Sequence, residues 1–324
     1  MPARLLVTGS SGFVGRAVVT QAAADGWQVL ASTRQDDVGF PAGVQPAPGL
    51  DLARGTDWRA TLDGVAAVVH CAARVHVMRD IASDPLSEFR CVNVAGTLNL
   101  ARQAVDAGVR RFVFISSIGV NGAETSDLPF KADDRAAPHS PYAQSKYEAE
   151  QGLRLIAQAS TLELVVIRPP LVYGPGAPGN FAQMMRALYA GVPLPLGAIH
   201  NRRSFVGLDN LVDLIMVCLV NVAAPNQTFL VSDDDDLSTT AMLRRTAKAL
   251  CRPARLLPIP APLLGAAARA LGKGELAQRL FGSLQVDIGK TRKLLGWAPV
   301  RTVDDGLQRT AAHFLAERQR PGSR

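Results

Sequence analysis

Residues 5–15 of the chain read LLVTGSSGFVG, an apolar run that leads into a glycine-rich turn. The run is typical of a buried strand, and Gly9, Gly12 and Gly15 lead into a helical pattern. Because glycines carry no side chains, a pyrophosphate can lie against backbone N–H groups at the start of that helix. A further strand is predicted at 28–33, the context that a dinucleotide-binding turn requires. The stretch therefore predicts a dinucleotide-binding α/β domain, although such glycines also occur in ordinary tight turns.

A second signal lies downstream, where Tyr142 and Lys146 stand four residues apart and Ser117 follows an apolar strand. Residues four apart project from the same face of a helix. A phenol with a pKa of about 10 is a poor base at neutral pH, but a nearby ammonium group favours the phenolate. We therefore predict acid/base chemistry at Tyr142. Tyr142 and Lys146 could also be ordinary residues on an exposed helix face. Ser116 is the alternative to Ser117 as the active-site serine.

The order of these motifs resembles the extended short-chain dehydrogenase/reductase superfamily, whose fingerprint is TGxxGxxG, then Ser or Thr, then YxxxK. The resemblance covers nearly the whole chain and favours the nucleotide-sugar epimerase and 4-ketoreductase branch. It implies that Lys146 binds the nicotinamide ribose, that Ser117 hydrogen-bonds the reacting oxygen, and that a homodimer forms through the helix bearing Tyr142. Further segments similar to nucleotide-sugar members are 70–73, Asn93, 168–174 and 203–206.

Apolar runs alternate with helix-length segments over the first half of the chain, which predicts a Rossmann-type doubly wound parallel sheet. After Arg168, prolines and glycines interrupt regular elements, so we expect a smaller, mostly C-terminal substrate lobe. The expected units are an NAD(P)-binding Rossmann domain at 1–168, a nucleotide-sugar lobe at 169–314 from which segments near 205–231 return to the main domain, and a polar tail at 315–324. The expected strands are 4–8, 28–33, 66–71, 111–116 and 162–167.

The predicted cofactor site combines the glycine turn with residues near later strand ends. The segment after the second strand offers Arg34 and no carboxylate for a ribose 2′-hydroxyl, which favours NADP(H), with NAD(H) as the alternative. Arg34 also has an interpretation as an exposed loop residue. The remaining positions follow from the resemblance. The full expected set is Gly9, Ser11, Gly12, Phe13, Val14, Gly15, Arg34, Asp51, Leu52, Ala72, Ala73, Asn93, Tyr142 and Lys146.

The expected substrate is a UDP-linked sugar. Arg203 is the expected diphosphate clamp, because a guanidinium group can bond phosphate oxygens in a fork, and Arg292 is a second candidate. Each Arg also has an interpretation as a surface residue. The full set of substrate contacts implied by the resemblance is Ser117, Tyr142, Asn180, Phe181, Arg203 and Arg292.

Three reactions of the resembled family start from a sugar beside the nicotinamide: 4,6-dehydration, 4-epimerisation and reduction of a 4-keto sugar. Dehydratases place Asp-Glu after their active-site Thr, whereas Ile118 and Gly119 stand here and cannot transfer a proton. Arg34 replaces the acidic residue typical of epimerases, and Asn121 stands where many carry Tyr. These departures favour a UDP-4-keto-(6-deoxy)hexose 4-reductase of surface polysaccharide synthesis. The alternatives are a UDP-glucose or UDP-N-acetylglucosamine 4-epimerase with retained NAD, and a non-enzymatic NADP(H)-binding regulator.

The composition, 324 residues of which 48% are hydrophobic, suffices for a large buried core. The formal charge of +7 comes from dispersed Arg residues, so we expect phosphate-bearing small molecules and not nucleic acid as partners. Four widely spaced Cys residues indicate neither a metal site nor disulfides and suit a reducing cytoplasm. The acidic run 233–236 is expected to form a solvated turn without a metal.

No membrane insertion is expected. The first core strand begins directly after Met1-Pro2-Ala3, which leaves no room for a signal peptide. The apolar stretch 211–222 is interrupted by Asp213 and is too short to span a bilayer, so we predict a packed helix there.

Overall fold

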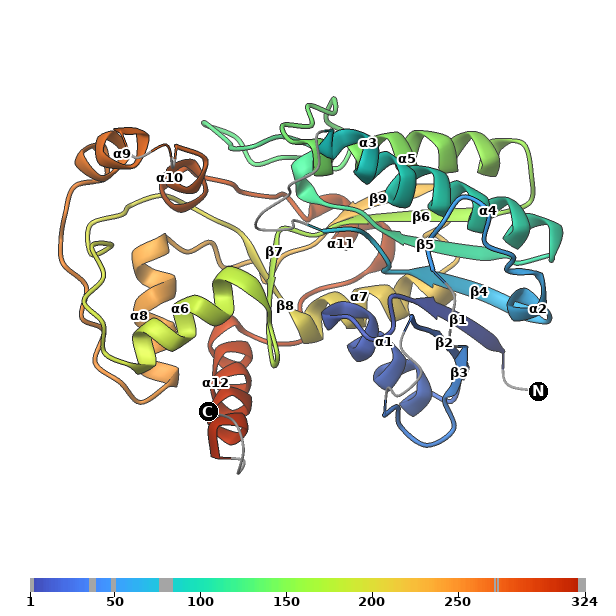
Figure 1. Cartoon of the computed structure of the whole chain (residues 1–324), viewed down its shortest axis with the longest axis horizontal. Helices are drawn as coiled ribbons and strands as arrows, with labels where there is room; N and C mark the ends of the chain where they lie inside the picture. Colours follow the sequence, from blue (N-terminus) through green and yellow to red (C-terminus); the bar gives the residue numbers. More distant parts are fainter. Residues whose placement is uncertain are drawn as a thin grey trace.

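The computed structural model describes residues 3–34, 39–47, 51–75, 84–270, 272 and 274–319, apart from the side chains of 275–277 and 279. Its centre is a seven-stranded sheet in which neighbouring strands run parallel, in the order β3-β2-β1-β4-β5-β6-β9 (Figure 1). The bounds of these strands are β1 Arg4–Thr8, β2 Gln28–Ser32, β3 Gln45–Ala47, β4 Val65–His70, β5 Arg111–Ile115, β6 Glu163–Arg168 and β9 Gln227–Leu230.

Helices cover both faces of this sheet. On one face lie α1 (Phe13–Ala24) and α7 (Leu208–Val220), and on the other lie α4 (Thr97–Asp106) and α5 (Pro141–Gln158). The short helices α2 (Arg59–Leu62) and α3 (Pro85–Phe89) contact α4 and α5 respectively. Because neither face of the central strands meets solvent, these strands are mostly apolar, and every residue of β5 is buried.

The order of the strands reverses between β1 and β4. From this point β2 and β3 follow on one side, and β5 and β6 follow on the other. Thr8, the last residue of β1, pairs with His70, the last residue of β4. Ligands of doubly wound sheets bind beyond the carboxyl ends of the strands at such a reversal, so the fold directs the search to this edge.

The doubly wound parallel sheet predicted from the sequence is confirmed, and each expected strand lies within one residue of its predicted ends. The packed helix predicted at 211–222 is present as α7. Strand β3 was not predicted, because it is short, contains Pro46 and lies at the sheet edge, where proline is tolerated. Within the described ranges, none of the helices combines the length and apolar character that crossing a membrane requires.

A smaller lobe lies to the left of the sheet in Figure 1. Its core contains Tyr173, Phe181 and Leu243, and α7 and β9 lie between its segments along the chain but belong to the main sheet. The polar tail expected from 315 is wrong in its first part, because α12 continues to Gln319, while 320–324 lie outside the described residues. The other elements that follow β6 along the chain are β7 Leu171–Tyr173, α6 Gly179–Tyr189, β8 Phe205–Gly207, α8 Thr239–Ala249, α9 Ala261–Ala270, α10 Gly274–Phe281, α11 Gly289–Leu295 and α12 Val303–Gln319.

A buried carboxylate joins the two parts. The hydroxyl of Tyr173 donates to Asp233 at 2.7 Å, and the same carboxylate accepts from the backbone of Gly207 at 2.8 Å and from Asn210 at 2.7 Å. Asp233 is 7% exposed, and burial raises its pKa. The solvated turn expected at 233–236 is therefore wrong for Asp233, because a hydrogen-bonded site compensates the cost of its burial. The other three carboxylates also have partners: Asp234 with Arg292, Asp235 with Arg245, and Asp236 with Ser204 and Gln285.

Candidate active site

The glycine turn between β1 and α1 forms a surface without side chains. Gly9 has a φ of +66°, and a Cβ atom there would lie 2.7 Å from the backbone nitrogen of Ala72. A Cβ atom on Gly15 would lie 2.1 Å from the carbonyl oxygen of Gly9. Gly12 caps α1 without a side-chain hydrogen bond, so backbone N–H groups of the first turn are available to an anion. This cradle fits the pyrophosphate of a dinucleotide.

The other residues predicted for the cofactor lie around this turn. Ser11 is exposed, Phe13 and Val14 are partly buried, and Arg34 is exposed two residues beyond β2. Ser10, which was not predicted, donates its hydroxyl to the carbonyl of Ser32 at 2.7 Å and so ties the turn to β2. Asp51 is exposed and accepts from the backbone of Leu52 at 2.8 Å.

His70 fastens the end of β4 to its neighbours. Its ring nitrogens lie 2.7 Å from the hydroxyl of Thr8 and 2.9 Å from that of Thr97. Burial, with a contribution from the charge of Lys146, lowers the pKa of His70 to about 3, so the ring is neutral at physiological pH. The Thr8 hydroxyl also accepts from the backbone of Ala72 at 3.3 Å, which places the predicted segment Ala72-Ala73 against the glycine turn.

Asn93, predicted to bind the cofactor, lies in a π-helical segment at Arg90–Gly96 and is 1% exposed. Its amide accepts from the backbone N–H of Arg74 at 2.8 Å and donates to the carbonyl of Arg74 at 3.0 Å and to Ser145 at 3.0 Å. Ser145 in turn donates to the carbonyl of Tyr142. The amide of Asn93 is thus engaged by protein groups and positions the helix that carries Tyr142.

Helix α5 presents the predicted acid/base pair. Ser140 caps the helix by accepting from the backbone of Ala143 at 3.2 Å, and Tyr142 and Lys146 follow in the first two turns. The ring of Tyr142 is partly buried and meets Phe89 edge-on at 6.0 Å between ring centres. Lys146 is 2% exposed.

The pKa values of this pair differ from the expectation. We expected the ammonium group to favour the phenolate, but burial raises the pKa of Tyr142 to about 12. Burial also lowers the pKa of Lys146 to about 8, with opposing contributions from Cys71 and Glu150. Desolvation disfavours the charged form of each group, and it is the largest cause of both pKa shifts.

Ser117 and Ser116 have different environments, which separates the two candidates. Ser117 follows β5 and accepts from the backbone of Gly119 at 3.1 Å, at the start of a 3₁₀ turn over Ile118–Val120. Ser116 is 4% exposed and donates its hydroxyl to Glu150 at 2.5 Å. The hydroxyl of Ser116 is therefore committed to the interior, and Ser117 is the better candidate for a substrate contact.

Gly119 leaves little space for the carboxylate that a dehydration site needs. A Cβ atom there would lie 3.2 Å from the ring of His139, 3.3 Å from Ala143 and 3.4 Å from the hydroxyl of Ser117. A longer acidic side chain would require these neighbours to move. The geometry thus supports the exclusion of dehydration.

Among the predicted substrate residues, Arg203 is a partly buried cation. It donates to the carbonyl of Gly282 at 2.9 Å, and no carboxylate in the described part of the chain pairs with it. Burial lowers the pKa of Arg203. A desolvated guanidinium group with free donors is suited to a phosphate.

The other predicted substrate residues differ from Arg203 in burial and in their partners. Phe181 is 7% exposed, and its ring stacks on Tyr173 inside the small-lobe core, so its side chain is engaged by the protein. Asn180 is exposed in the first turn of α6. Arg292 is exposed and pairs with Asp234 at 2.5 Å, so its guanidinium group is already engaged.

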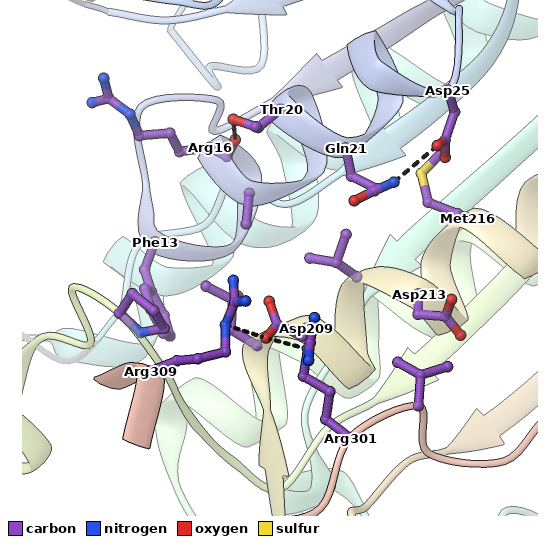
Figure 2. Close-up of a pocket in the computed structure, with 15 residues that line it drawn as sticks. Phe13, Arg16, Thr20, Gln21, Asp25, Asp209, Asp213, Met216, Arg301 and Arg309 are labelled. Carbon is purple, nitrogen blue, oxygen red and sulfur yellow. Dashed lines mark hydrogen bonds and ion pairs between the residues drawn. The ribbon is translucent and has the colours of Figure 1, made fainter. Parts of the chain in front are cut away.

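A groove of about 510 Å³ lies elsewhere, between α1, α7 and the segment that leads into α12. Figure 2 shows Arg301 and Arg309 converging on Asp209, at 3.0 and 2.9 Å. Phe13 lines this groove, but Ser117, Tyr142 and Lys146 do not. It is therefore separate from the acid/base pair.

Glu150 and Arg168 were missed by the sequence analysis as members of the site. They form a buried ion pair directly behind Ser116. The sequence contained a sign that the two residues are buried at the site, because Glu150 stands four residues after Lys146 and Arg168 ends an apolar strand. A carboxylate and a guanidinium group in such buried positions need partners.

Comparison with known proteins agrees with this geometry. Residues 5–231 match the pattern of the NAD dependent epimerase/dehydratase family. A protein of Vibrio cholerae described as UDP-glucose 4-epimerase is 45% identical over 322 residues, covering 99% of this chain and 98% of its own.

Two solved structures share the fold. The UDP-glucose 4-epimerase of Thermotoga maritima with UDP-glucose has a TM-score of 0.78 and 21% identity, covering 98% of this chain and 100% of its own. A short-chain dehydrogenase/reductase superfamily protein of Agrobacterium tumefaciens with bound NAD has a TM-score of 0.77 and 23% identity, covering 98% of this chain and 99% of its own. At these identities the two structures support the fold alone.

Proposed function

The chain belongs to the NAD dependent epimerase/dehydratase family, and on that premise we propose that it is a UDP-hexose 4-epimerase that uses retained NAD. The observation that carries this proposal is the 45% identity, over nearly the full length of both chains, to the Vibrio cholerae protein described as UDP-glucose 4-epimerase. The chain is an NAD-dependent enzyme of the extended short-chain dehydrogenase/reductase type, so the regulator alternative is not pursued.

This proposal reverses the order of the two reactions considered from the sequence. The 4-reductase and its NADP(H) preference rested on Arg34 and Asn121, whereas the family and the full-length relative favour the epimerase and NAD. Asn121 is 2% exposed, accepts from Arg168 at 2.9 Å and donates to the carbonyl of Lys131 at 2.9 Å. Asn121 thus has a structural role, so its presence in place of Tyr is weak support for a 4-reductase over a 4-epimerase. Arg34 is exposed, as its alternative interpretation expected.

The residues of the turn and of the strand ends would hold the cofactor. Backbone N–H groups of the first turn of α1, directly after Gly12, would bind the pyrophosphate, with Gly9 and Gly15 allowing its close approach. Lys146 would contact the nicotinamide ribose. When bound, NAD accepts a hydride from carbon 4 of the sugar and returns it, so no net oxidation occurs.

The chain's own groups would move the proton and hold the nucleotide. Tyr142 would take the proton of the 4-hydroxyl group and later return it to the same oxygen. Ser117 would donate a hydrogen bond to that oxygen, and Lys146 would supply positive charge beside the phenol. Arg203 would hold the diphosphate, which allows the keto sugar to rotate while the nucleotide stays bound.

One experiment separates the two reactions. Purified protein is incubated with UDP-glucose or UDP-N-acetylglucosamine, and in parallel with NADPH and a UDP-4-keto-6-deoxyhexose, with products identified by NMR. We expect formation of the carbon-4 epimer without net change of cofactor, and NAD bound to the purified protein. Stoichiometric consumption of NADPH without epimerisation would instead favour the 4-reductase over the 4-epimerase. A homodimer and a cytoplasmic location remain predictions.

A further inference from the structure

We propose that Glu150 and Arg168 are positioning residues of the active site, because their buried ion pair holds the turn that carries Ser117 against the helix that carries Tyr142 and Lys146. This inference rests on the proposed function, which assigns Ser117, Tyr142 and Lys146 to the reaction. It gives a role to two residues that contact none of the reacting groups themselves.

The ion pair joins two elements of the site. Glu150 lies on α5, one turn beyond Lys146, and Arg168 is the last residue of β6. The guanidinium group donates to both carboxylate oxygens, at 2.9 and 2.6 Å, and the two side chains are 5% and 1% exposed. Such a forked pair fixes the direction as well as the distance between its partners. Because a buried ion pair adds little net stability over apolar packing, a role in geometry is the stronger explanation for it.

The same pair holds both ends of the turn that carries Ser117. At the first end, Ser116 donates to Glu150 at 2.5 Å. At the far end, Asn121 accepts from Arg168 at 2.9 Å. Ser116 directly precedes Ser117, and Asn121 directly follows the 3₁₀ turn. A displacement of either ion-pair partner therefore moves the Ser117 turn relative to α5.

Glu150 also affects the charge of Lys146. The groups that face Lys146 are His70 and Cys71 at the end of β4, the ring of Phe114 at 4.5 Å with the carbonyl of Ile115 on β5, and Glu150 on its own helix. Burial lowers the pKa of Lys146 to about 8, while Cys71 and Glu150 oppose that effect. Removal of the Glu150 charge leaves the ammonium form less stable, so the pKa of Lys146 falls further.

The chain offers a matched control in Arg111 and Glu163. This pair joins β5 to β6 at the amino ends of the two strands, away from Ser117, whereas the Glu150–Arg168 pair joins α5 to the carboxyl end of β6. Arg111 donates to Glu163 at 2.8 and 2.6 Å, and the side chains are 7% and 21% exposed. A change that acts only through loss of an Arg–Glu pair should have similar effects at both places.

The experiment compares Glu150→Gln with Glu163→Gln in the full chain. We measure kcat and KM for UDP-glucose, thermal unfolding, and the pKa of Lys146 from the ¹⁵N resonances of the six lysines. Glu150→Gln should lower kcat by about 10- to 100-fold, the cost of a small misplacement of reacting groups, and bring the pKa of Lys146 below that of the unsubstituted protein. Glu163→Gln should leave both unchanged. If the kcat and the pKa of Lys146 in Glu150→Gln match those in Glu163→Gln, the positioning role is wrong.

Two further variants keep the test decisive if Glu150→Gln does not fold. Ser116→Ala and Asn121→Ala leave the ion pair in place but each release one end of the Ser117 turn. They should lower kcat with little change in KM, and unchanged kcat in both would overturn the proposal. The pKa of Lys146 needs no sugar, so it tests the role of Glu150 even if the protein fails to epimerise UDP-glucose and the proposed function falls.

Discussion

The ammonium group of Lys146 donates a hydrogen bond to the carbonyl oxygen of Ile115 at 2.9 Å, so the end of β5 holds the cation of the active site. The next residues of the chain, Ser116 and Ser117, begin the turn that bears the proposed substrate contact. The positions of Lys146 and Ser117 are thus coupled through one strand end. This coupling explains why the acid/base helix and the serine turn form a single unit.

Tyr142→Phe should lower kcat by about 100-fold or more, because general acid/base groups contribute 10²–10⁴-fold. The affinity for NAD should change little, since only a hydroxyl group is lost. The assay is epimer formation from UDP-glucose, with NAD binding followed by calorimetry. Tyr147→Phe, on the same helix, is the control and should remain active. Equal activity of the two variants would remove Tyr142 from the reaction.

Gly15→Ala should weaken NAD binding by about tenfold or more, because its Cβ atom would lie 2.1 Å from the carbonyl of Gly9 and displace the turn. Gly265→Ala is the control, since a Cβ atom at this position in α9 meets nothing within 4 Å. Calorimetric titration with NAD compares the variants. Unaltered affinity in Gly15→Ala would mean that the cofactor does not depend on this turn.

Arg203→Ala should weaken binding of UDP by about tenfold, since a hydrogen bond to a charged group contributes about 1.5–3 kcal/mol, while NAD binding is spared. Arg292→Ala should bind UDP normally, because its guanidinium group is engaged by Asp234 at the surface. Both affinities are measured by calorimetry. A loss confined to Arg292→Ala would reverse the assignment of the clamp.

His70 should make the fold sensitive to acid. Its pKa is lowered to about 3, whereas an unfolded His titrates near 6.5, so between these values the unfolded chain binds more protons and stability falls as the pH falls. The loss from pH 7 to pH 4 should be on the order of 3 kcal/mol, at 1.36 kcal/mol for each pH unit below 6.5. Urea unfolding of the protein and of His70→Gln measures this. Parallel pH dependences in the two proteins would contradict the prediction.

The sequence predicted the fold because the fold depends on local patterns, and the residues of the candidate site stay a prediction. Apolar runs mark the strands of a sheet covered on both faces, and the glycines mark a turn in which side chains would collide. Helical spacing predicts that Tyr142 and Lys146 share one face of α5, and the order of the motifs added the assignment of their roles. These features can be predicted without knowing which residues distant in the sequence become neighbours in the fold.

Features that depend on distant partners were not predicted correctly. The packing of Phe181 on Tyr173, which lies on another element, was not predicted. Asp233 looked solvated, yet Gly207 and Asn210 satisfy its carboxylate after folding. The pKa of Tyr142 was expected to fall, whereas burial raises it. In each case a tertiary contact or desolvation decides the outcome, and neither is visible in a local pattern.

Strands β7 and β8 pair in parallel, with Leu171 beside Phe205 and Tyr173 beside Gly207. The chain therefore leaves the main body after β7 and returns at β8 within one strand's length of its departure. The excursion at 174–204 includes α6 and Arg203 but no strand of the seven-stranded sheet. A change within this excursion therefore alters the proposed diphosphate contact at Arg203 without entering the seven-stranded sheet, whose strand ends lead to the proposed hydride-transfer residues.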